Sequence, residues 1–403
     1  MKKYLIISVF FFNVIINSFA QQNAPFEWEF DDDYKKTRIF IHAFVNYDFS
    51  PSWQIEWEKN LFKRNGLKTD FGSTTVKDLY NEIELVMNVD IGKDWWFRSS
   101  FYRDQSQYKD ENEEYNYMGF ERRIYRNLSI YSLCNTYYDK EEIDIDLGFS
   151  IMDSTSEKYC RIALSYDDFL YDEKNQKGGK VTEEPLGVNW AIRYSINKLW
   201  IFTQGKYTNC SEIEYNNPDL SPEIYLLQHQ INNLVAKMYY FFKRNCFSEL
   251  RIRHYHFFEK ELYYQTEFSY SYLNEIYDIS CKYQHQLNSK ISIRPVLHYI
   301  IQNAVANGYQ TYDFKRRELI PSIIMEYSLS NSAWEFGVVW SKYRLDYDDI
   351  NDLDDYETLN SDIKYMIRWT YNFSKNAWLQ FSISHVPEIE GFGGGNLHYM
   401  MFF

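Results

Sequence analysis

The feature that most constrains the fold is a period-two alternation of apolar and polar residues, which runs through long stretches of the chain. In residues 143–151, the odd positions from Ile143 to Ile151 are apolar, and the even positions are polar or small. Successive side chains of a β-strand point to opposite faces, so this pattern predicts a strand with one apolar and one polar face. The same pattern occurs in residues 79–91, 186–196 and 363–373.

The length of these segments points to a membrane. They run for roughly 10–13 residues, whereas a tilted membrane-spanning strand needs about 9–11 and a strand of a soluble sheet has about 5–6. The composition agrees, because the mean hydropathy is low at −0.54 while 20% of the residues are aromatic. In a barrel only alternate residues face lipid, and aromatic rings gather at the two interfaces.

Hydrogen bonding then requires the sheet to close, since hydrocarbon offers no partner for backbone N–H and C=O groups. The predicted fold class is therefore all-β, a single antiparallel transmembrane β-barrel over residues 21–403. We expect about 18 strands, with 16–20 allowed, at some 20 residues for each strand and its connection.

The N-terminus predicts export. Lys2 and Lys3 precede an apolar run from Tyr4 to Ile16, and Ser18 and Ala20 then place small residues at the two positions that a signal peptidase reads. This is the pattern of a secretory signal peptide over residues 1–20, cleaved before Gln21 and exported through the Sec pathway. The apolar run is too short for a membrane-spanning helix.

A repeated turn pattern predicts hairpins, in which an aromatic and an apolar residue, a few turn formers and a Trp follow one another. It occurs in residues 47–53, 194–200, 327–334 and 371–378, with a shorter version in 91–95. Longer polar connections are expected between these tight turns, as in barrels with short periplasmic turns and longer external loops. They are placed near residues 60–75, 104–114, 168–184, 208–222, 303–317, 346–357 and 387–395. The first strand is expected near 25–31 or 37–48, and the phase of the strands is unclear in 246–288.

The C-terminus carries a resemblance to a known class. Leu397, Tyr399, Met401 and Phe403 alternate with other residues, and the sequence stops on Phe403. A final amphipathic strand that ends in Phe resembles the terminal assembly signal of Gram-negative outer-membrane β-barrel proteins. With the signal peptide and the aromatic turns, the resemblance covers essentially the whole chain. It implies the barrel-assembly machinery and periplasmic chaperones as partners during biogenesis.

Charged residues alternate out of phase with the apolar residues of their strands and are expected to line the lumen. One interpretation is a polar pore lining, because rings of charge select ions and polar solutes. The other is structural, with arginines and carboxylates pairing across strands and holding the wall together. The residues concerned are Arg98, Arg161, Arg193, Arg294, Arg368, Glu82, Glu84, Asp144, Asp146 and Glu335.

Several function classes are disfavoured. A formal charge of −14 argues against nucleic acid as a partner. The sequence holds neither a GxSxG elbow nor an HExxH helix, so we expect no enzyme, no cofactor and no metal site. Any disulfide pairing is left open for the five scattered cysteines, Cys134, Cys160, Cys210, Cys246 and Cys281.

The sequence therefore predicts a porin-like channel of the cell outer membrane that passes ions or small polar solutes by diffusion. It would contact outer-membrane lipid and lipopolysaccharide, and its oligomeric state stays open, a homo-oligomer included. The alternative is a plugged structural or binding barrel, or the membrane subunit of a secretion or glycan-export assembly. The transported solute, and whether the lumen is open, do not follow from the sequence.

Overall fold

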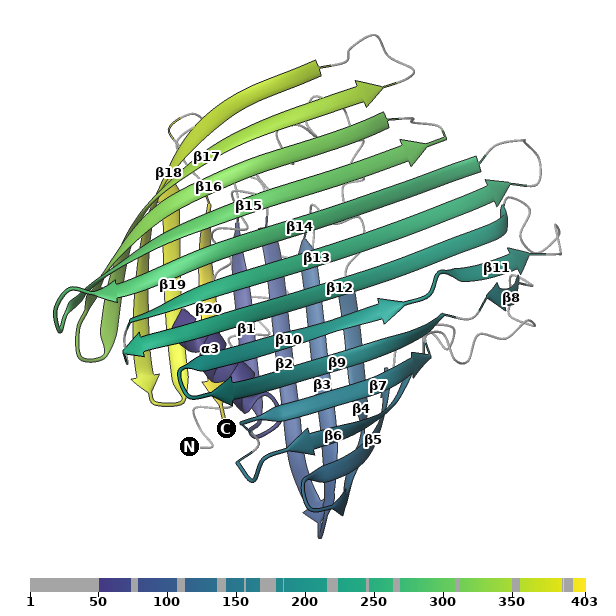
Figure 1. The fold of residues 1–403 in the computed structure, drawn as a ribbon, viewed down its shortest axis with the longest axis horizontal. Coiled ribbons are helices and arrows are strands. Elements are labelled where there is room, and N and C mark those ends of the chain that lie inside the picture. Colours follow the sequence, from purple (N-terminus) through teal and green to yellow (C-terminus); the bar gives the residue numbers. More distant parts are fainter. Residues whose placement is uncertain are drawn as a thin grey trace. The chain divides into compact units, whose positions relative to one another are not determined.

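The computed structural model places most of the chain in one antiparallel sheet (Figure 1). It divides the chain into two units, 1–41 and 42–403, and every described residue belongs to the second. The signal peptide and both positions considered for the first strand lie outside the described residues, so they stay predictions. The described residues are 51–73, 79–106, 113–135, 143–155, 157–166, 179–183, 185–215, 224–243, 246–263, 269–308, 312–349, 356–385, 387 and 394–403.

Within the described residues, the sheet consists of twenty strands, and helix α3 (Pro51–Asn60) precedes it. The strands are β1 (Gly66–Ser73), β2 (Leu79–Gly92), β3 (Trp95–Ser106), β4 (Glu113–Tyr125), β5 (Leu128–Asn135), β6 (Ile145–Met152), β7 (Tyr159–Tyr166), β8 (Gly179–Glu183), β9 (Leu186–Ile196), β10 (Leu199–Thr208), β11 (Ser211–Tyr215), β12 (Ile224–Lys243), β13 (Cys246–Tyr263), β14 (Ser269–Gln286), β15 (Ile291–Asn307), β16 (Tyr312–Ser328), β17 (Ser332–Asp349), β18 (Tyr356–Ser374), β19 (Ala377–His385) and β20 (Gly395–Phe402).

The sheet closes into a barrel because β1 pairs antiparallel with β20, from Gly66 opposite Phe402 to Ser73 opposite Gly395. The ring passes directly from β7 to β9 and from β10 to β12. The short strands β8 and β11 pair with each other, and β11 continues along β12 where β10 ends. Thus β8 with β9, and β10 with β11, are two interrupted strands. The ring has 18 strands, two fewer than the twenty segments, and the predicted fold class is confirmed.

The two ends of the barrel differ in their connections. At one end, here called the short-turn end, two to six residues join consecutive strands, as between Ile196 and Leu199. Arg126 and Asn197 adopt positive φ in two-residue turns there, with φ of 40° and 52°. Such turns match the twist of the flanking strands. At the other end, the long-loop end, four to twelve residues separate the strands. The predicted alternation of short turns and longer loops is confirmed, including the hairpins at 194–200, 327–334 and 371–378.

The exterior of the barrel is apolar. On β6, Leu147, Phe149 and Ile151 are exposed, while Asp146 and Ser150 on the opposite face are buried. The same division holds along β16 to β19, where the exposed residues include Ile323, Phe336, Ile367 and Phe381. No helix within the described ranges is long and apolar enough to cross a membrane.

Several sequence-based boundaries were wrong. The segment 47–53 was predicted as a hairpin, but Pro51 begins helix α3, which contains Trp53. Proline lacks an N–H and fits the first turn of a helix, where that group would have no partner. The predicted loop 60–75 contains β1, the predicted loop 303–317 is mostly strand, and half of the predicted loop 346–357 belongs to β17 and β18. The unclear region 246–288 resolves into the two long strands β13 and β14.

The strands also differ in length. From β12 to β18 they have 17–20 residues, well above the expected 10–13, whereas β1 to β7 have 8–14. Figure 1 shows the long strands β12 to β17 side by side. A membrane-spanning strand needs about 9–11 residues, so these strands continue beyond the membrane.

Candidate functional site

Helix α3 packs against the inner surface of the barrel wall where the sheet closes. Trp53 and Trp57 lie one turn apart on the same helical face. They form a buried apolar cluster with Val86 of β2 and with Met400 and Phe402 of β20. Strands β2 and β20, which both pair with β1, therefore hold one face of the helix.

The same helix also contacts the opposite side of the ring. Ile55 packs with Tyr239 of β12 and Phe247 of β13. Glu58 accepts a hydrogen bond of 2.7 Å from Lys237 Nζ of β12. Strand β12 is the tenth of the 18 ring strands counted from β1, half a ring away from the closure. Helix α3 thus crosses the lumen from wall to wall.

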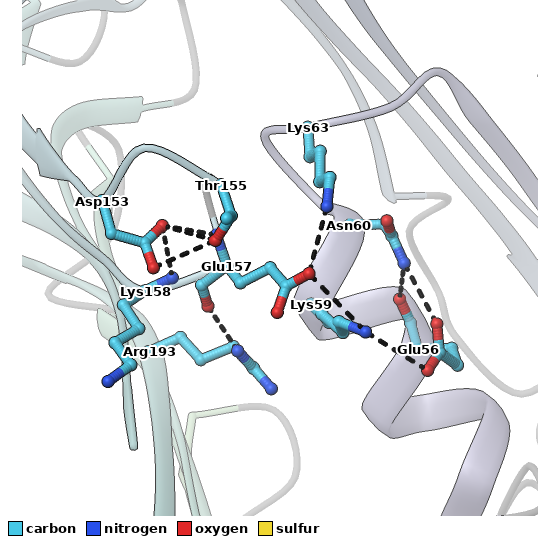
Figure 2. A network of polar contacts seen from close by, with 9 residues as sticks. All are labelled: Glu56, Lys59, Asn60, Lys63, Asp153, Thr155, Glu157, Lys158 and Arg193. Atoms are coloured by element: carbon cyan, nitrogen blue, oxygen red, sulfur yellow. Dashed lines mark hydrogen bonds and ion pairs between the residues drawn. The ribbon is translucent and has the colours of Figure 1, made fainter. Parts of the chain in front are cut away.

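The helix is also held by the turn between β6 and β7 (Figure 2). Lys59 Nζ and Lys63 Nζ lie 3.6 and 3.0 Å from Glu157 Oε1. Arg193 of β9 donates to the backbone carbonyl of Glu157. These contacts join the helix and the residues that follow it to a third part of the wall, which we call the Glu157 latch.

Asp153 shapes the latch turn. Its Oδ1 accepts hydrogen bonds from the Thr155 hydroxyl at 3.0 Å and from the backbone N–H groups of Glu157 at 2.9 Å and Lys158 at 3.3 Å. Burial raises the pKa of Asp153, but these hydrogen bonds outweigh it and hold the pKa below its ordinary value. The ionised carboxylate keeps the turn in the conformation that presents Glu157 to the two lysines.

The residues after the helix are fixed by backbone contacts. Asn88 Nδ2 donates to the carbonyl of Leu61 at 3.1 Å, and Arg98 Nη1 donates to the carbonyl of Phe62 at 2.9 Å. The Phe62 ring packs edge-on against Tyr159, with ring centroids 4.8 Å apart. The chain therefore remains attached to the wall between α3 and β1.

Close packing of Trp57 depends on Gly66, the first residue of β1. A Cβ atom at position 66 would lie 2.8 Å from Trp57 Cζ3 and 3.0 Å from Phe402 Cδ1. Real Cβ contacts are almost never below 3.0 Å. Glycine at this position gives the indole its space against the wall.

Glu58 is the buried acidic group of the helix. Burial raises its pKa above the ordinary value of 4.5, although the nearby Lys237 ammonium opposes this shift. The carboxylate lies beside the Tyr239 hydroxyl, and the Tyr159 hydroxyl donates to the backbone carbonyl of Glu58 at 2.9 Å. This end of the helix is bound to the wall mainly by polar contacts.

The ten predicted lumen-facing residues lie on the side of the wall opposite to the exposed apolar side chains. Seven are buried, and Glu82, Glu84 and Asp144 are partly buried. Arg98 and Arg161 converge on Glu121 of β4, with N–O distances of 2.9 and 2.6 Å. Ser150 donates to the other oxygen of Glu121 at 2.6 Å.

A second cluster joins β15, β17 and β18, with β16 lying between the first two. Arg294 of β15 and Arg368 of β18 both bind Glu335 of β17, at 2.9 and 2.8 Å. Glu335 lies directly opposite Arg368 in the β17–β18 register. In both clusters the predicted charges pair across strands, which is the structural interpretation of the lumen charges.

The other predicted residues form smaller contacts. Glu82 and Glu84 both bind Lys68 of β1, at 3.3 and 2.6 Å. Asp146 accepts two hydrogen bonds of 2.8 Å from Asn189 Nδ2. Asp144 lies 3.7 Å from Lys206 Nζ, and Arg193 belongs to the latch.

Sequence reasoning missed Glu121, Lys68 and the lumen helix. Glu121 is followed by Arg122 and Arg123 in the sequence. Three consecutive charged residues do not alternate, so the pattern does not show which face of the strand Glu121 occupies. The helix had a readable signal, because Pro51 precedes tryptophans four residues apart, as expected for a helix start followed by one helical face.

The four residues of the predicted assembly signal share the outward face of β20. Leu397 and Phe403 are exposed, and Tyr399 and Met401 are partly exposed. Asn396, His398, Met400 and Phe402 on the other face are buried. The role of the outward residues in assembly stays a prediction.

The described residues show little sign of a chemical centre. All five cysteines are free thiols. Within these parts of the chain, no group of three or more His, Cys, Asp or Glu side chains is arranged to hold a metal ion.

Comparison with known proteins finds similarity at the level of architecture. No family model matches the sequence, and no curated protein does. Among solved structures, the chain is similar to a bacterial polysaccharide outer membrane secretin, at 8% identity and a TM-score of 0.40, over 85% of this chain and 99% of that one. It is also similar to OccAB2 of Acinetobacter baumannii (8% identity, TM-score 0.38, 84% and 97% covered) and to an outer membrane channel of Pseudomonas putida F1 (8%, 0.36, 84% and 96%).

A closed ring of an even number of antiparallel strands with an apolar exterior is the architecture of outer-membrane barrels. The chain is a barrel of this kind. Its polar inner wall and the helix across its lumen are the features from which a function must be argued.

Proposed function

We propose that the protein is an outer-membrane channel for ions or small polar solutes, and that helix α3 restricts passage through its lumen. The observation that most directly supports this proposal is that α3 contacts both β20 and β12, which lie half a ring apart. A solute that moves along the barrel axis must pass beside this helix or displace it.

The inner wall supports a polar route. Charged residues such as Arg98, Arg161 and Glu335 face the lumen, and polar groups keep a lumen wet. Many of these charges are held in cross-strand clusters, so the wall stays rigid when the helix moves. In this proposal the wall is the fixed part of the channel and α3 is the part that sets its conductance.

The test is conductance across a planar bilayer. The wild-type protein should give small steps. Trp57→Ala should give larger or more frequent steps, because truncating a buried tryptophan costs about 3–5 kcal/mol and releases the helix from β20. The matched control is Trp334→Ala on the exposed outer face of β17, which should conduct like the wild type.

A second variant perturbs the same contact in the opposite way. Gly66→Ala adds a methyl group against the Trp57 ring and should also raise conductance. In the double variant Gly66→Ala/Trp57→Ala the methyl group no longer meets an indole, so the effects should not add. Unheated and boiled samples of each variant should differ in gel mobility, which shows that the barrel is folded.

If none of these folded variants gave conductance steps, the proposal that the protein is a channel would be wrong. That result would favour the second candidate, a plugged barrel with a structural or binding role. That candidate is supported by the number of attachments of α3, which include the Glu157 latch and the Glu58–Lys237 pair.

A further inference from the structure

The outer surface of β16 and β17 changes character abruptly along the strands. Toward the short-turn end it is apolar, with exposed Ile323 and Leu319 on β16 and Trp340 on β17. The next outward positions toward the long-loop end are Arg317 on β16 and Lys342 on β17, both exposed. A row of lipid-facing side chains therefore ends directly at a row of cations.

The strand register brings three of these cations together. Arg317 lies directly opposite Arg344, and Lys342 lies opposite Leu319, one outward position nearer the apolar surface. Directly opposite residues have Cβ atoms about 4.5–5.5 Å apart, and like charges in such a pair are destabilising. This arrangement therefore favours an anion between the arginines.

The carboxylates of this surface lie on the far side of the cations. Arg344 Nε lies 2.9 Å from Asp346 Oδ1, and Lys315 Nζ lies 2.6 Å from Asp313 Oδ2. Within the described residues, neither Arg317 nor Lys342 forms an ion pair. The cations stand between the apolar surface and the acidic groups, at the level where lipid headgroups meet a barrel.

The cationic surface is local. In the register row of Arg317, the neighbouring residue on β15 is Ile301, and the next on β14 is Tyr277. The whole chain carries a net charge of −14, which would repel anionic lipid elsewhere. A basic surface confined to two adjacent strands indicates a specific headgroup position.

We propose that Arg317, Lys342 and Arg344 bind the phosphate groups of lipopolysaccharide in the outer leaflet. Long loops mark the external side of bacterial barrels, so these cations lie at the outer-leaflet boundary. Arginine binds phosphate through paired N–H donors, and lysine adds a point charge. The acyl chains would lie along the apolar surface that contains Leu319 and Trp340. The inference does not depend on whether solutes pass through the lumen.

The experiment measures binding of bisphosphorylated lipid A to the purified full-length protein by native mass spectrometry. Arg317→Gln/Lys342→Gln should weaken binding by roughly tenfold or more, since each basic residue near an anionic surface contributes about 1 kcal/mol. Arg122→Gln/Lys375→Gln is the matched control, because it removes one exposed Arg and one exposed Lys near the short-turn end. The control should bind like the wild type.

Two further probes identify what is recognised. Dephosphorylated lipid A should bind the wild type no better than bisphosphorylated lipid A binds the double variant. Phosphatidylglycerol should bind more weakly than lipid A. The charge-preserving variant Arg317→Lys/Lys342→Arg should keep most of the affinity, so a loss in the glutamine variant reports charge and not misfolding.

Three results would overturn the proposal. Equal lipid A binding by the glutamine variant and the wild type would show that these cations are not the site. Equal binding of the dephosphorylated lipid would show that phosphate is not recognised. Equal binding of phosphatidylglycerol would assign the surface to ordinary anionic phospholipid.

Discussion

The indole of Trp57 stacks on the ring of Phe402, with the ring centroids 5.6 Å apart and the planes at 27°. This contact joins the lumen helix to the last strand of the barrel. The next residue, Phe403, lies on the outward face and is 57% exposed, whereas Phe402 is 3% exposed. Two adjacent phenylalanines thus face opposite sides of one wall.

The two phenylalanines should therefore give different phenotypes. Phe402→Ala should loosen α3 while the barrel still assembles, because a buried Phe→Ala change costs about 3–5 kcal/mol of packing. Phe403→Ala should lower the yield of assembled barrel and leave the helix docked in the molecules that do assemble. Hydrogen-exchange mass spectrometry of residues 51–60 reports the first effect, and heat-modifiable gel mobility of outer-membrane fractions the second. Identical outcomes for both variants would show that Phe402 and Phe403 do not have separate roles in helix docking and barrel assembly.

The pair between Lys237 and Glu58 should be strongly coupled. Lys237→Met leaves the buried Glu58 carboxylate without its cation, which we expect to cost about 3–5 kcal/mol of helix docking. Lys237→Met/Glu58→Gln should recover much of this loss, since no uncompensated charge remains. Exchange rates of the helix amides in the single and double variants complete a double-mutant cycle. Additive effects would contradict direct coupling.

Helix docking should tighten as the pH falls. Glu58 has a raised pKa where it is docked, so it takes up a proton more readily there than after release. The contribution of Glu58 to the stability of the docked helix is fully present below the ordinary pKa of 4.5. It is lost as the pH rises through the raised pKa of the docked state. Lys237, Arg193, Glu249, Tyr239 and Tyr159 surround the group and set the size of the effect.

The measurement is conductance between neutral pH and pH 4.5, the ordinary pKa of Glu58. We expect smaller or rarer steps at the acidic end, and Glu58→Gln should remove most of the dependence. A channel that opens on acidification would show that another group controls the helix.

The Glu157 latch should be weak and sensitive to salt. Its lysines and carboxylate are partly exposed, so Glu157→Gln should cost roughly 0.2–1 kcal/mol of docking. The difference from wild type should shrink near 1 M salt, where the screening length is about 3 Å. Helix exchange rates at low and high salt give the measurement, with Asp313→Asn as a surface-charge control. A salt-independent difference would indicate a change in the turn itself.

Cys281 offers a direct test of the lipid-facing surface. It is exposed on β14, between Leu250 of β13 and Leu297 of β15, both of which are exposed. In a bilayer, a lipid-soluble maleimide should label Cys281, and a membrane-impermeant one should not. In detergent-free denaturant, all five thiols should react without reduction. Labelling of Cys281 by the impermeant reagent in a bilayer would place this face in water.

Much of the barrel could be predicted because the alternation that marks each strand lies within the sequence of that strand. In β9 the alternation from Leu186 to Ile196 marks one strand with the correct ends. Strand β1 was missed because Gly66 and Gly72 dilute its alternation, and it was assigned to a loop.

The candidate site depends on contacts that no local pattern contains. Glu121 binds Arg161 forty positions away, and Ile55 meets Tyr239 only because β12 lies across the ring from the closure. The inward side of Arg98 followed from its strand, but its partners required the ring order. Trp53 was misassigned because an aromatic residue after turn formers also fits the barrel's own hairpin pattern.

The unequal strand lengths give the barrel a slanted rim. Strands of 17–20 residues from β12 to β18 exceed the membrane-spanning requirement of about 9–11 by several residues each, at about 3.3 Å per residue. On that side of the ring the strands extend beyond the membrane-spanning length, whereas the strands near β5 to β7 end closer to it. Among the described strands, the rim at the long-loop end is therefore higher beside β12 to β18 than beside β5 to β7.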